Sequence, residues 1–197
     1  MTTTSQILDK IRTLEAELAA QLALEQANLK FGIENGKIIF EAEMLRQHKA
    51  MQIKLWPYLR AAGLLTILTA PLIYGLTLPL VLLDIFVTIY QAVCFPVYGI
   101  AKVRRQDYLN FDRSHLAYLN ALEKINCGYC AYGNGILGYA GEIAARTELY
   151  WCPIKHARRM QYMHSQYRNF VEFGDAEAFK QKSEKPDLPS DPPPDAR

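Results

Sequence analysis

Apolar residues dominate one central stretch of the chain. In residues 61–101, Asp84 is the one side chain that carries a charge at neutral pH, whereas both flanks are rich in charge. About 20 apolar residues suffice for a helix to cross a hydrocarbon core of about 30 Å, and this stretch is about twice that length. The pattern therefore predicts two membrane-spanning helices, at about 56–74 and 79–101, joined by a turn at 75–78.

Basic residues on both sides of this stretch predict its orientation. Cytoplasmic flanks of membrane helices carry an excess of Lys and Arg, so we expect both termini on the cytoplasmic side of a bacterial inner membrane. Because the first pass is short and contains Pro71, a re-entrant hairpin is the competing geometry. The basic residues are Arg46, Lys49, Lys54 and Arg60 before the stretch, and Lys102, Arg104 and Arg105 after it.

Asp84 lies inside the second predicted pass, where a charged side chain is costly. One interpretation is a proton or cation site among helices. The other, which we favour, is a residue near the far interface or bonded to Thr77 or Thr88.

Apolar residues recur at helical spacing near the N-terminus. The stripe predicts an amphipathic helix capped by Ser5 and covered by a partner or a returning helix. Asn35-Gly36 marks a break, and residues 38–55 are predicted to form a second helix. The stripe consists of Ile7, Ile11, Leu14, Leu18, Leu22 and Leu29, and the polar side carries Lys10, Arg12, Glu15 and Glu17.

The C-terminal half predicts three further helical segments. Apolar residues from Tyr108 to Ile125 follow helical spacing, and a second helix begins near Gly135. Its four glycines leave a strip almost free of side chains, which lets another backbone approach closely. A last helix is predicted from Pro153 to Gly174, and the charged, proline-rich residues 180–197 are typical of a disordered tail. The glycines are Gly133, Gly135, Gly138 and Gly141.

Together these patterns predict an all-α protein built on a membrane helical hairpin. Its expected parts are amphipathic N-terminal helices (1–55), a two-helix transmembrane hairpin (56–101), a cytoplasmic helical metal-binding domain (102–179) and a disordered tail (180–197). The protein has 197 residues, of which 50% are hydrophobic and 21% charged, with a net charge of +2. This small net charge argues against nucleic-acid binding, and the basic run 155–159 suits a membrane surface better.

Three cysteines and one histidine form the most specific chemical motif. Cys127 and Cys130 make a CxxC pair, and Cys152 and His156 make a CPxxH pair after a spacer of 21 residues. Thiolates and an imidazole in two close pairs are the ligand set of tetrahedral zinc. Pro153 as a first helical residue would place Cys152 at the N-cap, with His156 on the first turn. The spacing predicts a structural zinc site, because four protein ligands leave no open position for catalysis.

Other interpretations of these residues remain open. The cysteines could be buried packing residues, a dithiol redox pair, or ligands of an iron or iron–sulfur centre, since some clusters use a similar ligand set. Four cysteines in a chain of this length are too few for a disulfide scaffold. The phosphate-loop, dinucleotide-binding, serine-hydrolase and zinc-protease motifs are all missing from the sequence, so no small-molecule substrate is indicated.

Three short segments carry a family resemblance. They are CGYCAYGNG at 127–135, EIAART at 142–147 and YWCPIKHA at 150–157. The region from about 100 to 160 resembles a group of small uncharacterised bacterial inner-membrane proteins. This resemblance implies an inner-membrane location and brings no activity, cofactor or partner with it.

The expected function follows from these features. The sequence predicts a non-catalytic, membrane-anchored, zinc-stabilised accessory or assembly subunit that binds a larger membrane protein complex or a second copy of itself. The alternative is an electron-transfer or redox-sensing protein at the membrane face, using an iron centre or the Cys127/Cys130 dithiol.

Overall fold

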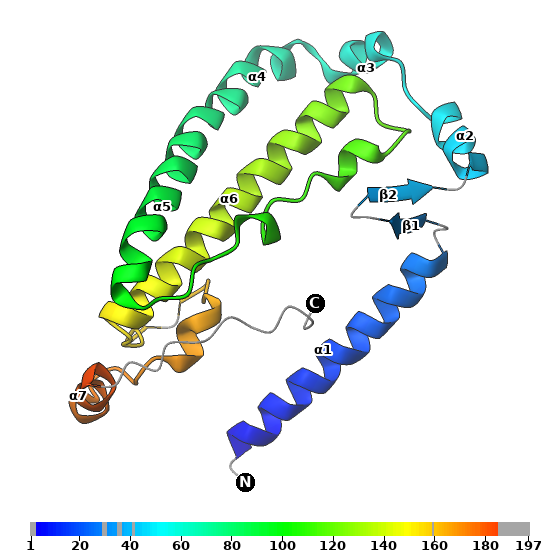
Figure 1. Cartoon of the computed structure of the whole chain (residues 1–197). Helices are drawn as coiled ribbons and strands as arrows, with labels where there is room; N and C mark the ends of the chain where they lie inside the picture. Colours follow the sequence, from blue (N-terminus) through cyan, green and yellow to red (C-terminus); the bar gives the residue numbers. More distant parts are fainter. Residues whose placement is uncertain (1–2, 29–30, 35–36, 41, 159, 185–197) are drawn as a thin grey trace. The chain divides into compact units, whose positions relative to one another are not determined.

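The computed structural model describes residues 3–28, 31–34, 37–40, 42–158 and 160–184. In this part of the chain the regular secondary structure is helical, as predicted, apart from one short β-hairpin (Figure 1). Its elements are α1 (Thr3–Asn28), β1 (Phe31–Glu34), β2 (Lys37–Phe40), α2 (Ala42–Ala50), α3 (Leu55–Ala62), α4 (Leu64–Gly75), α5 (Thr77–Tyr98), η1 (Arg105–Asp107), η2 (Asp112–His115), α6 (Ala121–Trp151), η3 (Ser165–Asn169) and α7 (Ala176–Glu184).

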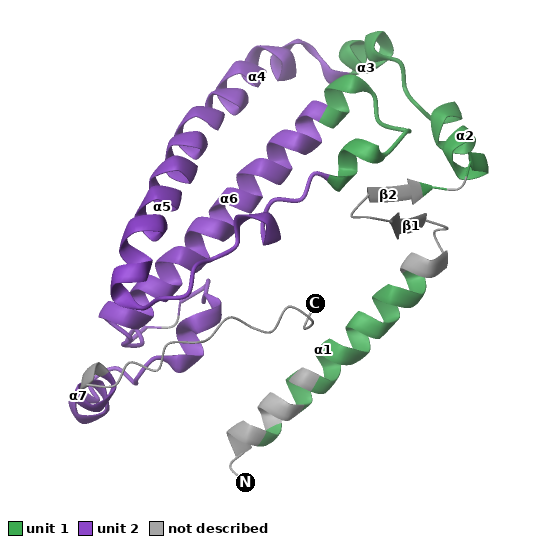
Figure 2. Ribbon diagram, viewed as in Figure 1, with its two compact units in different colours: residues 1–61, 112–124 green, residues 62–111, 125–197 purple. Residues whose placement is uncertain are grey.

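The chain divides into two compact units (Figure 2). The first unit combines residues 1–61 with 112–124, and the second combines 62–111 with 125–197. The sequence placed 112–124 with the C-terminal domain, whereas the structure groups this segment with the N-terminal part.

The first unit contains a β-hairpin where a helix was expected. Strands β1 and β2 pair antiparallel, from Phe31 opposite Phe40 to Glu34 opposite Lys37. The predicted helix 38–55 is therefore wrong at its start and again after residue 50, because α2 spans Ala42–Ala50 and residues 51–54 are not helical. Consecutive β-branched and aromatic residues in β2 favour a strand. The predicted break at residues 35–36 lies outside the described residues.

A capping box starts α6 within the first unit. The Asn120 backbone N–H donates to a Glu123 carboxylate oxygen at 2.8 Å, and the Glu123 N–H donates to Asn120 Oδ1 at 3.0 Å. This reciprocal pair satisfies backbone donors at the helix start.

Upstream, residues 105–115 form two short 3-10 turns instead of the predicted helix. Asn120 and Gln52 also tie this segment to the N-terminal part, because Asn120 Nδ2 donates to the Ile53 carbonyl and Gln52 Nε2 to the Leu119 carbonyl.

In the second unit, α4 and α5 form one continuous apolar run. Leu76, between them, keeps a right-handed helical backbone, and its N–H donates to the Ile73 carbonyl at 3.1 Å. The turn predicted at 75–78 is therefore not formed, and the prediction of two antiparallel passes is wrong. Gly75 and Pro79 weaken a helix, but the backbone at Leu76 stays right-handed and the chain does not reverse there. Residues Leu64–Tyr98 make the one helix in the described part that is long and apolar enough to cross a membrane.

Helix α6 lies beside α5 and runs in the same direction (Figure 1). Tyr74 contacts Tyr129 near the start of both helices, and Tyr98 stacks on Tyr150 near their ends, with ring centroids 5.7 and 5.2 Å apart. The segment from 99 to 111 runs back in the opposite direction against both helices. The buried core at this junction consists of Phe95, Ile100, Val103, Ile136, Tyr139 and Ile143.

The glycine strip on α6 receives this returning segment, as the sequence predicts. A Cβ atom at Gly135 would lie 2.5 Å from the Tyr108 carbonyl oxygen and 2.8 Å from Leu109 Cδ2, and one at Gly138 would lie 3.2 Å from the Tyr108 ring. Only glycine lets the two backbones approach this closely at residue 135.

The region after α6 differs from the predicted helix 153–174. Pro153 and Val171 lie in paired extended segments: the Val171 N–H donates to the Pro153 carbonyl at 2.7 Å and the Lys155 N–H to the Val171 carbonyl at 2.8 Å. This pairing takes backbone donors that a helix would use, and among the described residues between the two segments the short turn η3 is the one helical element. Helix α7 then covers 176–184, so the predicted disorder is wrong for 180–184, while 185–197 lie outside the described residues.

Candidate functional site

The four predicted metal ligands lie in two separate places. Cys127 and Cys130 are one turn apart near the start of α6, whereas Cys152 directly follows the last residue of that helix. At about 1.5 Å per residue, Cys130 and Cys152 are separated by roughly 33 Å of helix. His156 lies in the following loop, where its N–H donates to the Tyr167 hydroxyl at 2.9 Å and its ring stacks on Tyr167.

These positions do not fit one bound metal ion. Zinc–sulfur bonds are about 2.3 Å long, and no group of three or more His, Cys, Asp or Glu side chains among the described residues could hold an ion. The expected CxxC turn is instead a continuous stretch of α6, and Cys152 does not cap a new helix. In this arrangement the four side chains do not meet at a common point.

A different polar cluster lies inside the apolar second unit, centred on Asp84. Arg105 donates to this carboxylate through two nitrogens: Nε to Oδ1 at 3.0 Å and Nη2 to Oδ2 at 2.6 Å. Tyr132 donates its hydroxyl to Oδ2 at 3.1 Å, and Thr88 donates to Oδ1 at 3.4 Å. Asp84 is 9% exposed. Residues from α5, α6 and the returning segment therefore meet at one carboxylate.

The cluster continues along α5 through Tyr139 and Gln91. The Tyr139 hydroxyl lies 3.4 Å from Thr88 Oγ1 and accepts a hydrogen bond from Gln91 Nε2. Gln91 also binds both polar atoms of the Val103 backbone, accepting its N–H at 2.9 Å and donating to its carbonyl at 3.2 Å. The Gln91 amide thus gives the Val103 backbone the two hydrogen bonds that a neighbouring strand would supply in a sheet.

The electrostatics of the cluster follow from these bonds. The hydrogen bonds from Arg105 to Asp84 raise the pKa of the guanidinium further above neutral. Burial raises the pKa of the Tyr132 phenol, and its hydrogen bond to Asp84 acts in the same direction. Tyr132 therefore stays a protonated donor, and Arg105 a cation, throughout the neutral range.

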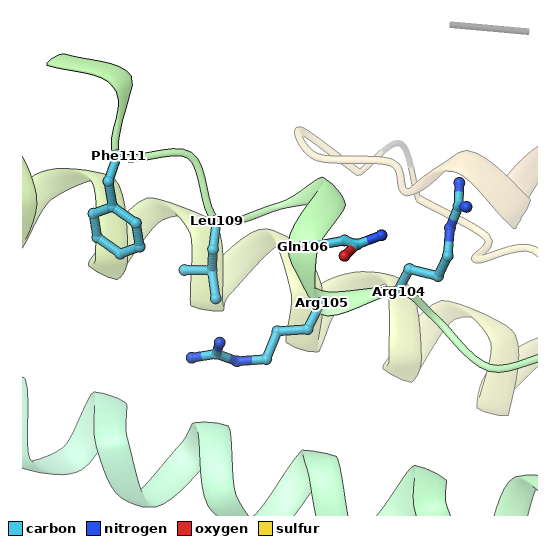
Figure 3. A pocket seen from close by; sticks show the side chains of 5 residues that line it. All are labelled: Arg104, Arg105, Gln106, Leu109 and Phe111. Carbon is cyan, nitrogen blue, oxygen red and sulfur yellow. The ribbon is translucent and has the colours of Figure 1, made fainter. Parts of the chain in front are cut away.

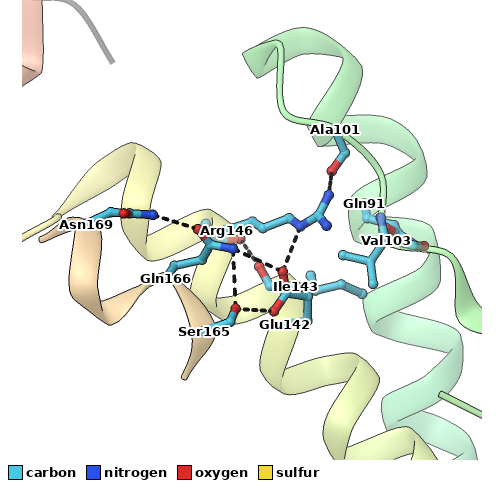
Figure 4. A network of polar contacts seen from close by, with 10 residues as sticks. Gln91, Ala101, Val103, Glu142, Ile143, Arg146, Ser165, Gln166 and Asn169 are labelled. Carbon is cyan, nitrogen blue, oxygen red and sulfur yellow. Dashed lines mark hydrogen bonds and ion pairs between the residues drawn. The ribbon is translucent and has the colours of Figure 1, made fainter. Parts of the chain in front are cut away.

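A second polar network joins the end of α6 to the segments around it (Figure 4). Arg146 donates to Glu142 at 3.0 Å and to the Ala101 carbonyl at 2.6 Å. Ser165 and Gln166 of η3 donate to the same Glu142 carboxylate, at 2.7 and 3.3 Å. Both charged side chains are largely buried, so the network attaches η3 and the start of the returning segment to α6.

Two hollows border the returning segment and the helices. One of about 570 Å³ is lined by Arg104, Arg105, Gln106, Leu109 and Phe111 (Figure 3). Both arginines in it already pair with carboxylates, Arg104 with Asp107 and Arg105 with Asp84. The other, of about 400 Å³, is a mainly apolar groove between α5 and α6 that includes Cys130. The charged side chains of the first hollow therefore already form ion pairs within the protein, and no charged residue lines the second among the described residues.

The arrangement is suited to holding segments together. Its members are an arginine–carboxylate pair, two phenols, a hydroxyl and an amide, each bonded to another part of the second unit. Sequence reasoning singled out Asp84 and gave Thr77 or Thr88 as its possible bonding partner, of which the structure has Thr88, but it missed Arg105, Tyr132, Gln91 and Tyr139. The sequence did hold a signal for this ion pair: Asp84 is a lone acidic residue in an apolar stretch, and the basic pair Arg104 and Arg105 follows that stretch.

No protein-family model, curated protein or solved structure matches the chain.

Proposed function

We propose that this protein is a non-catalytic, membrane-anchored accessory protein that docks on other membrane components. The observation that carries the proposal is the exposed apolar surface of α4 and α5. Leu72, Phe86 and Val97, for example, are 76%, 69% and 77% exposed. An uninterrupted apolar surface of this kind marks a contact with lipid or with another protein.

The two sides of α5 support insertion in lipid. Its outward positions are apolar, whereas its inward positions include Asp84, Thr88 and Gln91, whose polar atoms are bonded to α6 and to the returning segment. Polar side chains in membrane helices face protein neighbours in this way. In α4, nearly every side chain is exposed and none is charged, which suits a helix surrounded by hydrocarbon.

The accessory role rests on where the polar groups are used. The hydrogen bonds of the Asp84 cluster and of Glu142 link elements of one unit. The polar side chains of these two networks therefore stabilise the fold. The exposed apolar stripe of α1 is a second surface available to a partner, which we take to be a larger membrane complex or another copy of the chain. The iron-centre form of the electron-transfer alternative gains no support, because Cys152 and His156 lie beyond the end of α6, far along the helix from Cys127 and Cys130.

Membrane insertion is tested with the full chain expressed in bacteria. We expect the protein to stay with the membrane after alkaline carbonate extraction. A Leu72→Lys, Phe86→Lys variant places two charges on the outward face and should be extracted at least tenfold more, because each costs about 2.5–3.5 kcal/mol at the bilayer centre. Gln47→Lys on exposed α2 is the matched control and should behave like the parent. A parent protein that is released by carbonate, or that stays monodisperse without detergent, would overturn the proposal.

A further inference from the structure

Helix α1 carries an apolar stripe that nothing in the described part of the chain covers. Ile11, Leu14, Leu18 and Leu22 follow each other at steps of three and four residues and are 45–60% exposed. All residues from 13 to 25 are exposed. A stripe of this spacing is the seam of a helix pair, so its occupant is another helix.

The charges beside the stripe indicate which helix fits. Lys10 and Glu17 lie on the same flank of α1, seven residues apart, and both are exposed. When two copies of α1 lie antiparallel with Leu14 opposite Leu14, Ile11 of one copy faces Leu18 of the other. In that register each Lys10 lies beside Glu17 of the other copy, which gives two opposite-charge contacts by symmetry.

A parallel pair fits less well. Glu25 continues the stripe after Leu18 and Leu22, so a parallel pair would bring the two Glu25 carboxylates together across the seam, where like charges destabilise. The antiparallel register separates them, because each Glu25 then faces the first residues of the opposite helix.

We infer that α1 pairs with α1 of a second copy of this chain, antiparallel, with Leu14 at the centre of the seam and Lys10 against Glu17 on its flank. The inference rests on the proposed docking role and names its partner. The seam is short, so the pair is weak in solution. Anchoring both copies in one bilayer raises their effective concentration and favours the pair.

Zero-length carbodiimide cross-linking tests the register, because this reagent joins an amine to a carboxylate in direct contact. Equal amounts of ¹⁴N- and ¹⁵N-labelled full-length protein are reconstituted together in phosphatidylethanolamine–phosphatidylglycerol vesicles and analysed by mass spectrometry. We expect mixed-isotope products joining Lys10 to Glu17. Mixed products joining Lys10 to Glu15, or no mixed product, would overturn the inference.

Charge exchange gives the second readout. Lys10→Glu and Glu17→Lys should each lower the amount of cross-linked dimer at least fivefold, measured with a longer, residue-independent photoreactive linker, and the double exchange should restore it. Leu14→Asp should abolish the dimer, whereas Ala20→Asp, on the opposite side of α1, should leave it unchanged. Equal effects of these two Asp variants would contradict a seam at Leu14.

Failure of this inference and failure of the proposed function give different results. A chain that resists carbonate extraction but stays monomeric in vesicles refutes the pairing and leaves the membrane anchor intact. A chain that dimerises through α1 but is released by carbonate refutes the anchor alone.

Discussion

Arg105 binds both carboxylate oxygens of Asp84, 21 residues earlier in the chain, with its Nε at 3.0 Å and its Nη2 at 2.6 Å. A bidentate pair of this kind fixes direction as well as distance. Asp84 lies on α5 and Arg105 on the returning segment, so the pair holds an extended piece of chain against a helix. The adjacent Tyr132 bond adds α6 to the same junction.

Removing the Asp84 charge should therefore loosen the returning segment. Asp84→Asn leaves Arg105 without its carboxylate, and we expect the free energy of unfolding in detergent to fall by about 1–3 kcal/mol. Amides of residues 103–109 should exchange hydrogen faster. Arg104→Gln is the control, because Arg104 makes a single bond to Asp107, three residues on in the same segment, and local pairs of this kind contribute about 0–1 kcal/mol. Equal losses in both variants would contradict a special role for Asp84.

Two glycines on α6 should respond in opposite ways to the same substitution. Gly135→Ala places a methyl group 2.5 Å from the Tyr108 carbonyl oxygen, and overpacking of this kind costs about 1–3 kcal/mol. Gly128→Ala meets nothing within 4 Å and should stabilise the helix by about 0.5–1 kcal/mol. Thermal unfolding of the two variants in the same detergent measures the difference. A stabilising Gly135→Ala would show that the close approach is not present.

Gln91 should matter more than the Tyr139 hydroxyl that it binds. Gln91→Leu leaves the Val103 N–H and carbonyl without their partner in a buried place, at a cost of about 1–3 kcal/mol for each unsatisfied group. Tyr139→Phe keeps the ring and removes one hydroxyl, which should cost about 1 kcal/mol. Chemical unfolding of both variants tests the order. A smaller loss for Gln91→Leu would mean that the amide does not replace a strand neighbour for Val103.

The cysteines should be dispensable for folding. Because Cys130 and Cys152 stand at opposite ends of α6, we expect Cys152→Ser and treatment with a strong chelator to leave the protease resistance of 127–160 unchanged. Metal analysis of the purified chain should give less than one tenth of an equivalent of zinc or iron. If the chain instead bound one equivalent of zinc, and either Cys152→Ser or Cys127→Ser alone removed it, the four ligands would have to converge.

The sequence predicted local features more successfully than the meeting of distant segments. The glycines at 133–141 correctly indicated a close backbone approach, because the missing side chains are themselves the signal. Their partner, Tyr108, lies in a segment whose apolar spacing resembles a helix. The chain on both sides of Tyr108 instead forms the 3-10 turns η1 and η2, and its contact with Gly135 on α6 depends on residues far away in the sequence.

The four predicted metal ligands lie apart in the structure for a related reason. CGYC is compatible with a tight turn, and glycine normally weakens a helix, so the sequence favoured a knuckle at 127–130. In the structure, contacts of α6 with α5 and with the returning segment keep the helix continuous. Cys152 and His156 then follow its far end. The 21 residues between Cys130 and Cys152, a spacing that would suit a zinc site if they formed a compact loop, are instead helical.

The uninterrupted joint at Leu76 also limits how the proposed anchor can sit in a bilayer. A rod of 35 residues is about 52 Å long, and tilts of membrane helices reach about 40°, which lets a 30 Å layer accommodate roughly 26 residues. At least one end of the rod must consequently emerge. At that tilt Asp84, in the C-terminal half of the 35-residue rod, stays within the layer whichever end emerges, and its bonds to Arg105 and Tyr132 supply the partners that hydrocarbon lacks.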